Sequence, residues 1–139
     1  MWVGGETGED GFEDILNSNS STAVNVTTSG DEAGTFTTGT TTVTFSEIEE
    51  IQTDSGNDTV DLSGDSSGMD VLTYSGDDTV TGGSGDDYIL AGTGDDSISG
   101  AEGADTLLGE AGDDTITIAD IRDAHISSVV YHQFAQLIW

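Results

Sequence analysis

A nine-residue phrase is repeated five times without interruption between Thr73 and Thr117. In each copy the fourth residue is Gly, the sixth is Asp and the eighth is a branched aliphatic residue. The copies read TYSGDDTVT, GGSGDDYIL, AGTGDDSIS, GAEGADTLL and GEAGDDTIT. A fixed period of this kind predicts a solenoid, because one short unit cannot bury its own apolar face and must stack on a neighbour.

Each position of the phrase has a physical role. Glycines among the first four residues allow a tight turn that brings backbone carbonyl oxygens together, and the last three residues form a short strand whose middle side chain points inward. The inward residues are Val80, Ile89, Ile98, Leu107 and Ile116, and the sixth-position residues are Asp78, Asp87, Asp96, Asp105 and Asp114. An all-oxygen set of carbonyls and carboxylates favours Ca²⁺, whereas Zn²⁺ prefers His or Cys.

The fifth position is also acidic in four copies, at Asp77, Asp86, Asp95 and Asp113. We expect these side chains to face solvent and to add to the anionic field.

Two less regular copies precede the uninterrupted run. Gly56, Asp58 and Val60 fit the first of them. Gly68, Asp70 and Leu72 fit the second, which follows after three extra residues and is one residue short of the next copy. We expect both copies to join the stack, so Asp58 and Asp70 are added to the candidate metal ligands.

The phrase resembles GGxGxDxUx, the nonapeptide of the hemolysin-type RTX calcium-binding repeats. The resemblance covers 73–117, extends less regularly over 54–72 and is absent beyond Ala119. It implies an all-β, right-handed parallel β-roll in which two nonapeptides form one coil and the turns alternate between two edges. Asp78, Asp96 and Asp114 would then line one edge, and Asp87 and Asp105 the other. Calcium ions would lie between Asp78 and Asp96, between Asp96 and Asp114, and between Asp87 and Asp105.

The resemblance also implies backbone carbonyl ligands from the first four turn positions. These are Gly82, Gly83, Gly85, Gly92, Gly94, Gly100, Gly103, Gly109 and Gly112. The chain departs from the family pattern at the first position, with Thr73 and Ala91, and at the second, with Tyr74, Ala101 and Glu110. Backbone carbonyls survive these changes, although Thr73 and Tyr74 should curl less easily than glycine.

Three regions follow from the pattern: a Thr-rich β region over 1–53 adjoining the solenoid, the β-roll over 54–118, and a cap or tail over 119–139. Three short β-branched runs lie between residues 23 and 45, separated by turn signals. Both hairpins and irregular solenoid rungs fit them. The apolar spacing in 119–139 fits both a helix and a strand, and its length and Ala and Gln content favour a capping helix.

Charge restricts the partners. The chain has 28 acidic residues and one basic residue, a formal charge of −27. Such a charge repels nucleic acid and anionic membranes and attracts cations. No apolar stretch approaches the roughly 18 residues needed to cross a bilayer, so we expect no membrane insertion. The chain also lacks Cys.

No catalytic constellation is expected. Residues 64–68 fit the G-x-S-x-G pattern, but a nucleophile elbow needs a strand–turn–helix setting that this segment does not predict. The histidines His125 and His132 do not by themselves make a zinc site. We therefore expect a binding protein and not an enzyme.

The first functional hypothesis is calcium binding by a secreted bacterial module that is largely disordered without calcium, because ligation and folding should be one event. The resemblance implies export by a type I secretion apparatus that reads a C-terminal signal, and the start MWVGGETGED carries no N-terminal one. Two alternatives stay open. One is a surface adhesion or carbohydrate-binding module that uses the Thr-rich strands to bind a glycan or surface partner. The other is the accessory C-terminal part of a larger secreted enzyme or toxin.

Overall fold

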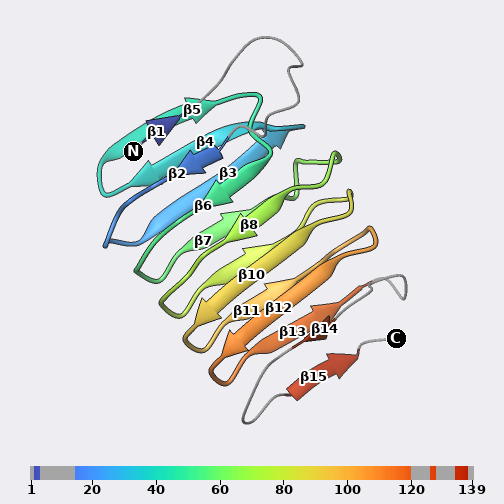
Figure 1. Ribbon diagram of the computed structural model, residues 1–139. Helices are drawn as coiled ribbons and strands as arrows, with labels where there is room; N and C mark the ends of the chain where they lie inside the picture. The colour runs from blue at the N-terminus through green and yellow to red at the C-terminus, as the bar shows by residue number, and fades with distance from the viewer. Residues whose placement is uncertain (1, 4–14, 120–125, 128–133, 138–139) are drawn as a thin grey trace.

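The computed structural model describes residues 2–3, 15–119, 126–127 and 134–137. The regular secondary structure of these residues consists of β-strands alone, and the strands stack as coils of a β-solenoid (Figure 1). The predicted all-β, parallel architecture is therefore confirmed. Because no helix occurs in the described residues, none of them belongs to a helix that could span a membrane.

Two sheets face each other across the solenoid. The first sheet contains β1 (Trp2–Val3), β2 (Ile15–Asn17), β6 (Glu50–Gln52), β8 (Asp70–Leu72), β10 (Tyr88–Thr93), β12 (Thr106–Ala111) and β14 (Ile126–Ser127). The second contains β15 (Phe134–Leu137), β13 (Thr115–Ile118), β11 (Ser97–Ser99), β9 (Thr79–Thr81), β7 (Thr59–Asp61), β3 (Val24–Gly30), β4 (Ala33–Thr38) and β5 (Thr41–Phe45). Successive strands of the repeat region thus alternate between the sheets.

The pairing register confirms that two nonapeptides make one coil. Tyr88 of β10 pairs with Thr106 of β12, and Ser97 of β11 pairs with Thr115 of β13, all in parallel ladders. Each pair is 18 residues apart, so every copy lies beside the second copy after it. Equivalent turn residues therefore stack in columns along the edges of the solenoid.

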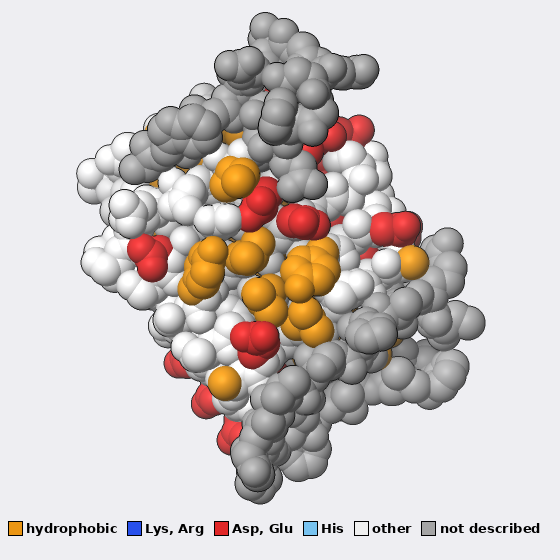
Figure 2. Space-filling view, viewed as in Figure 1, with side chains coloured by type: hydrophobic (Ala, Val, Ile, Leu, Met, Phe, Trp, Pro, Cys, Tyr) orange, Lys and Arg blue, Asp and Glu red, His pale blue; other side chains and the backbone are white. Residues whose placement is uncertain are grey.

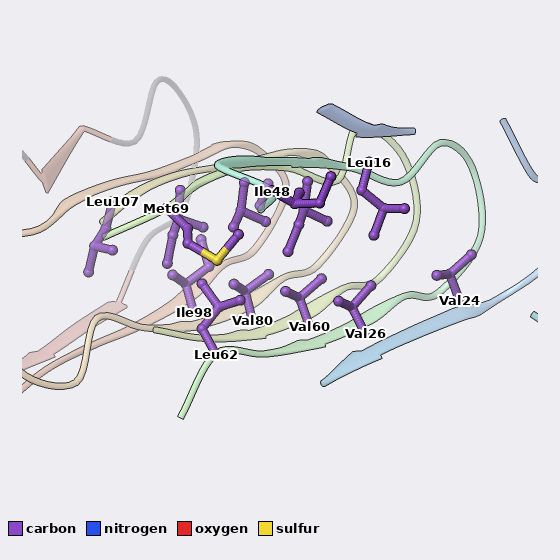
Figure 3. Close-up of a cluster of buried hydrophobic side chains, with 14 of the residues drawn as sticks. Leu16, Val24, Val26, Ile48, Val60, Leu62, Met69, Val80, Ile98 and Leu107 are labelled. Atoms are coloured by element: carbon purple, nitrogen blue, oxygen red, sulfur yellow. The ribbon is translucent and has the colours of Figure 1, made fainter. Parts of the chain in front are cut away.

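The inward side chains of the two sheets form a thin, continuous core (Figure 3). Each short strand contributes its middle residue, as the phrase predicts. The second sheet supplies Val26, Val60, Val80, Ile98 and Ile116, and the first supplies Leu16, Ile51, Val71, Ile89 and Leu107, all 0–2% exposed. Full burial of such side chains contributes roughly 1.5–3 kcal/mol each, which only a stack of neighbours can provide.

The Thr-rich region forms hairpins. β3 pairs antiparallel with β4, and β4 with β5, while the other side of β3 pairs parallel with β7. Phe36 of β4 and Phe45 of β5 are buried. The hairpin alternative is correct, and these strands continue the second sheet beyond the first coil.

The predicted phase of the copy around Asp70 is wrong. Asp70 pairs with Tyr88 and with Glu50, while Met69 and Val71 are buried on either side of it. The first residues of β7, β8 and β9, residues 59, 70 and 79, lie 11 and nine positions apart. The three extra residues and the missing one are thus a single two-residue lengthening of the turn 62–69, which shifts Asp70 off the inward phase.

At the C-terminus, β14 pairs with β12 and β15 with β13, both parallel. The described part of the predicted cap is therefore strand, and the capping helix is not found there. The remaining residues after Ala119 lie outside the described residues, as do His125 and His132.

The two outer faces differ chemically. The first sheet exposes Tyr88 and partly exposes a row of Leu72, Leu90 and Leu108, and Tyr74 is exposed in the turn that follows β8. Figure 2 shows apolar side chains gathered in the middle of one face, with acidic side chains around them. The second sheet carries two rows of polar side chains instead. One row is Thr42, Thr37, Asn25, Thr59, Thr79, Ser97 and Thr115, and the other is Thr44, Thr35, Thr27, Asp61, Thr81, Ser99 and Thr117.

Candidate metal sites at the coil edges

The sixth-position aspartates form two columns. Asp58, Asp78, Asp96 and Asp114 directly precede β7, β9, β11 and β13, and we call this column the Asp58 edge. Asp87 and Asp105 directly precede β10 and β12 on the opposite side, which we call the Asp87 edge. The predicted separation of these residues into two edges is confirmed. All six are 0–3% exposed although they are carboxylates.

One carboxylate oxygen of each aspartate links two coils. The backbone N–H of Asp78 donates to Oδ1 of Asp96 at 2.8 Å, and that of Asp96 to Oδ1 of Asp114 at 3.1 Å. The N–H of Asp58 donates to Asp78 in the same way, and that of Val24 to Asp58, each at 2.8 Å. On the Asp87 edge, Met69 donates to Asp87 and Asp87 to Asp105, each at 2.9 Å.

The second oxygen, Oδ2, has different surroundings along the Asp58 edge and at Asp87. Oδ2 is buried without a hydrogen-bond partner in Asp58, Asp78, Asp96 and Asp114. Oδ2 of Asp87 accepts the N–H of Gly83 at 2.8 Å. A buried carboxylate oxygen without a partner is costly, so the Asp58 edge is an array of oxygens suited to a cation.

Burial raises the pKa of the Asp58, Asp78 and Asp87 carboxyls. The same cause, with the neighbouring charges of Asp78 and Asp114, raises the pKa of Asp96 to about 6. The sites therefore favour a positive partner, either a proton or a metal ion, over the bare carboxylate.

The first-position glycines leave room beside these carboxylates. A Cβ on Gly82 would lie 2.6 Å from Oδ2 of Asp87 and would collide with the carbonyl oxygen of Gly100. A Cβ on Gly100 or Gly109 would likewise collide with Oδ2 of Asp105 or Asp114. Carbonyl and carboxylate oxygens thus meet beside these glycines, and the spaces suit an oxygen-liganded ion such as Ca²⁺.

The fourth-position glycines are required for stacking. Gly94 has φ 134° and Gly112 has φ 148°. A Cβ on Gly94 would collide with the carbonyl oxygen of Gly76, and one on Gly112 with that of Gly94. Gly103 has φ 124° and meets the carbonyl of Gly85 in the same way. These glycines let successive turns approach closely.

Non-glycine residues take the left-handed conformation at the second position. Tyr74, Ala101 and Glu110 have φ values of 66–68°, and Gly92 has φ 113°. The turn at Tyr74 therefore forms despite its side chain. Gly83 and Gly85, in the copy closest to the family phrase, are not among the residues with positive φ. Their turn instead packs against the lengthened turn 62–69, where a Cβ on Gly83 would lie 2.6 Å from the Asp65 carbonyl oxygen.

Not every predicted ligand joins these columns. The side chain of Asp70 is exposed, on the opposite phase from the buried Met69. Within the described residues no three Asp, Glu, His or Cys side chains converge on one point. A metal ion at either edge would therefore need backbone carbonyls besides carboxylates.

The sequence did not point to Asp65, which is 2% exposed. Its Oδ1 accepts the N–H of Glu32 at 2.9 Å, and its Oδ2 accepts those of Ser67 at 3.1 Å and Gly68 at 3.2 Å. It fastens the lengthened turn to the β3–β4 hairpin. Asp65 falls outside the nine-residue phase, and its only sequence signal is the Gly-Asp-Ser turn composition.

The fifth-position aspartates face solvent as expected, but they also link coils. The N–H of Asp95 donates to Oδ1 of Asp77 at 3.1 Å, and that of Asp113 to Oδ1 of Asp95 at 2.9 Å. Ala104 donates to Asp86 at 2.8 Å. These bonds run in the opposite direction from those of the sixth position, so each coil is hydrogen-bonded to both neighbours through carboxylates.

Residues 71–98 and 81–116 match a family model described as the RTX calcium-binding nonapeptide repeat, which is found in four copies. No curated protein and no solved structure matches the chain.

Proposed function

Residues 71–116 belong to the RTX calcium-binding nonapeptide repeat family, and from this premise we propose that the coil edges bind calcium and that the coils holding the ions fold with it. The family supports calcium binding as such. The observation that supports these particular sites is the column of buried Oδ2 atoms without protein partners on the Asp58 edge. Bound calcium would supply a positive charge beside the carboxylates of Asp96 and Asp114. The carbonyl oxygens of the adjoining turns would complete its ligands.

Calorimetric titration with calcium tests the sites through a matched pair of variants. Asp96→Asn keeps the size of a buried sixth-position side chain and removes its charge. Asp95→Asn makes the same change at the exposed fifth position next to it. We expect Asp96→Asn to lose at least one bound ion, and Asp95→Asn to bind as the wild type does, with a midpoint of roughly 10⁻⁴ to 10⁻³ M. Equal binding by both variants would refute the assignment.

We propose that the chain works as a secreted bacterial module whose repeats order outside the cell, where calcium is abundant. Its type I export would use residues 119–139. Support comes from the family, which is typical of secreted bacterial proteins, and from the −27 charge that opposes collapse without cations. The test is export of a C-terminal fusion to a reporter by a bacterial type I system. Undiminished export after removal of residues 119–139 would contradict this role.

We propose no catalytic role. The Ser66 hydroxyl of the G-x-S-x-G segment donates to Oδ1 of Asp31 at 2.7 Å. It lies in the turn between strands β7 and β8, with no helix following it. This strand–turn–strand setting differs from the strand–turn–helix geometry of a nucleophile elbow.

The two polar rows on the second sheet support a second candidate, binding to the flat surface of an ordered polysaccharide. The rows extend from the β5 hairpin strand through β13, and neighbouring strands are about 4.8 Å apart. Hydroxyls offer one donor and two acceptors each, so such an array matches a hydroxyl-rich surface.

Sedimentation with crystalline cellulose or chitin in calcium checks this candidate. We expect Thr79→Lys, in the middle of one row, to release the protein from the solid. Thr106→Lys, on the outer face of the first sheet, serves as the matched control. Failure of the wild type to sediment with either solid, in calcium, removes the candidate.

A further inference from the structure

The first-position residues of the Asp58 edge change systematically along the stack. The pairing of Gln52 with Leu72, of Leu72 with Leu90 and of Leu90 with Leu108 places the residues that follow them side by side. That column is Thr53, Thr73, Ala91 and Gly109. The N-terminal half of the column thus carries hydroxyls, and the C-terminal half carries none.

The two threonines already make contacts that a cation would make. Oγ1 of Thr53 donates to the carbonyl oxygen of Thr73 at 3.2 Å, and Oγ1 of Thr73 donates to that of Ala91 at 3.0 Å. Both threonines are 0–1% exposed. Ala91 has no hydroxyl to offer Gly109, so the same carbonyl of the next coil receives no such bond.

Each threonine hydroxyl has one proton, and it is directed to a backbone carbonyl of the next coil in both cases. Such carbonyls are among the oxygens that an ion between coils would need. The hydroxyls therefore join two turns at the place where an ion would otherwise join them, while Oδ2 of Asp58 and of Asp78 stays without a partner.

On the Asp87 edge, apolar side chains take the ligand positions at the N-terminal end of the repeat stack. Pairing of Asp61 with Thr81 places Leu62 beside Gly82, and pairing of Asp70 with Tyr88 places Met69 beside Asp87. Leu62 and Met69 are 0% and 2% exposed. At the coil before Gly82, this edge therefore offers neither the first-position glycine nor the sixth-position carboxylate.

We propose that Thr53 and Thr73 stand in for a cation on the Asp58 edge, so that the coils from β6 to β9 fold without calcium and those from β10 to β13 require it. This inference rests on the proposed calcium binding. It limits the ions to the turns that begin at Gly82, Ala91, Gly100 and Gly109. It also gives assembly a direction, because each added coil of a solenoid needs a formed neighbour, and β8 and β9 provide one before calcium arrives.

Amide hydrogen exchange on the full chain, stripped of metal and then loaded with calcium, tests the division. Amides of β6–β9 should be protected in both states, and amides of β10–β13 only with calcium. Uniform loss or uniform retention of protection in the stripped protein overturns the inference.

Three variants test the threonine role directly. Ala91→Thr adds the hydroxyl that the column lacks, and we expect one fewer bound calcium and protection of β10 and β11 without metal. Ala91→Val adds similar bulk without a donor and should not extend protection. Thr73→Val removes a donor and should lower protection of β8 and β9 in the stripped protein without changing the number of calcium ions bound at saturation. Equal exchange in Ala91→Thr and Ala91→Val overturns the inference.

Calorimetry separates the two proposals. Calcium uptake by the wild type with no N-terminal protection in its absence contradicts the threonine role and leaves calcium binding intact. Absence of uptake by the wild type refutes calcium binding itself, and this inference with it.

Discussion

A single sixth-position aspartate has two separate tasks, one for each oxygen. Oδ1 of Asp96 accepts the backbone N–H of Asp78 and so fixes the spacing of two coils. Oδ2 remains buried without a protein partner. Asparagine would retain the first contact and lose the charge for the second, which is why Asp-to-Asn changes separate stacking from ion binding.

Asp96 predicts a pH dependence with opposite signs in the two states. Its folded pKa of about 6 lies above the ordinary value of 3.8, so its protonated form favours the metal-free fold. That stabilisation is complete below about pH 3.8 and is lost as the pH rises through about 6. Metal-stripped protein should therefore melt at a higher temperature at about pH 5 than at about pH 7.5.

Calcium reverses this sign, because a proton on Asp96 competes with the ion. Calcium affinity should fall as the pH drops from about 7.5 to about 5, and calorimetry at both values would show it. A melting temperature of the stripped protein that falls on acidification would contradict the pKa assignment.

The fourth-position glycines make the sharpest stability prediction. In Gly94→Ala the Cβ would collide with the Gly76 carbonyl, at a φ of 134° that side chains rarely adopt. We expect a loss of about 3 kcal/mol or more in the free energy of unfolding of the calcium-loaded protein. Gly30→Ala, with nothing within 4 Å of the new Cβ, is the control and should change stability by about 0.5 kcal/mol at most. Chemical denaturation of both variants measures the difference.

At the scale of the element, each three-residue strand is held by its middle side chain. Ile98 of β11 is 1% exposed and lies between Val80 and Ile116 of the neighbouring strands. Ile98→Ala should cost about 2–5 kcal/mol, since the void cannot close between two rigid sheets. Ser97→Ala, on the outer face of the same strand, should change stability by less than about 0.5 kcal/mol. Similar denaturation midpoints for the two variants would contradict this account of the core.

The nine-residue phase predicted these strands well because the same spacing determines turn, carboxylate and inward residue at once. It failed at Asp70 because a short motif cannot tell a lengthened turn from a shifted repeat. Only the buried Met69 and Val71 in the structure show that the phase resumes one residue earlier. The hairpin strands β3–β5 were predicted as strands, but their antiparallel order depends on long-range pairing that local alternation does not encode.

The candidate site was predictable to the same degree. The two edges follow from the period and the alternation of turns. The partners of each carboxylate do not, since they depend on how closely neighbouring coils stack. The threonine contacts were not predicted either. In the sequence Thr73 is only a departure from glycine, and the structure shows that its hydroxyl donates to the Ala91 carbonyl.

At the scale of the whole molecule, the charge of −27 must be neutralised before the chain compacts, and the question is whether any cation can do this. At 0.1 M, monovalent salt largely screens interactions between exposed charges that are more than about 10 Å apart, and it screens buried groups much less. The sixth-position carboxylates are 0–3% exposed, so screening should leave their cost largely in place. Mg²⁺ requires a tighter octahedral shell and dehydrates reluctantly, which fits poorly with fixed carbonyls from two separate coils.

We therefore predict selective compaction by calcium. The hydrodynamic radius of the metal-stripped chain should fall on adding about 1–10 mM calcium, a concentration above the expected midpoint. The fall should be clearly smaller with magnesium, or with sodium chloride at matched ionic strength. Neither salt provides a divalent ion whose coordination geometry adapts to the buried carboxylates and carbonyls. Dynamic light scattering on the three titrations makes the comparison. Equal compaction by all three salts would show that general screening, and not ligation at the coil edges, condenses the chain.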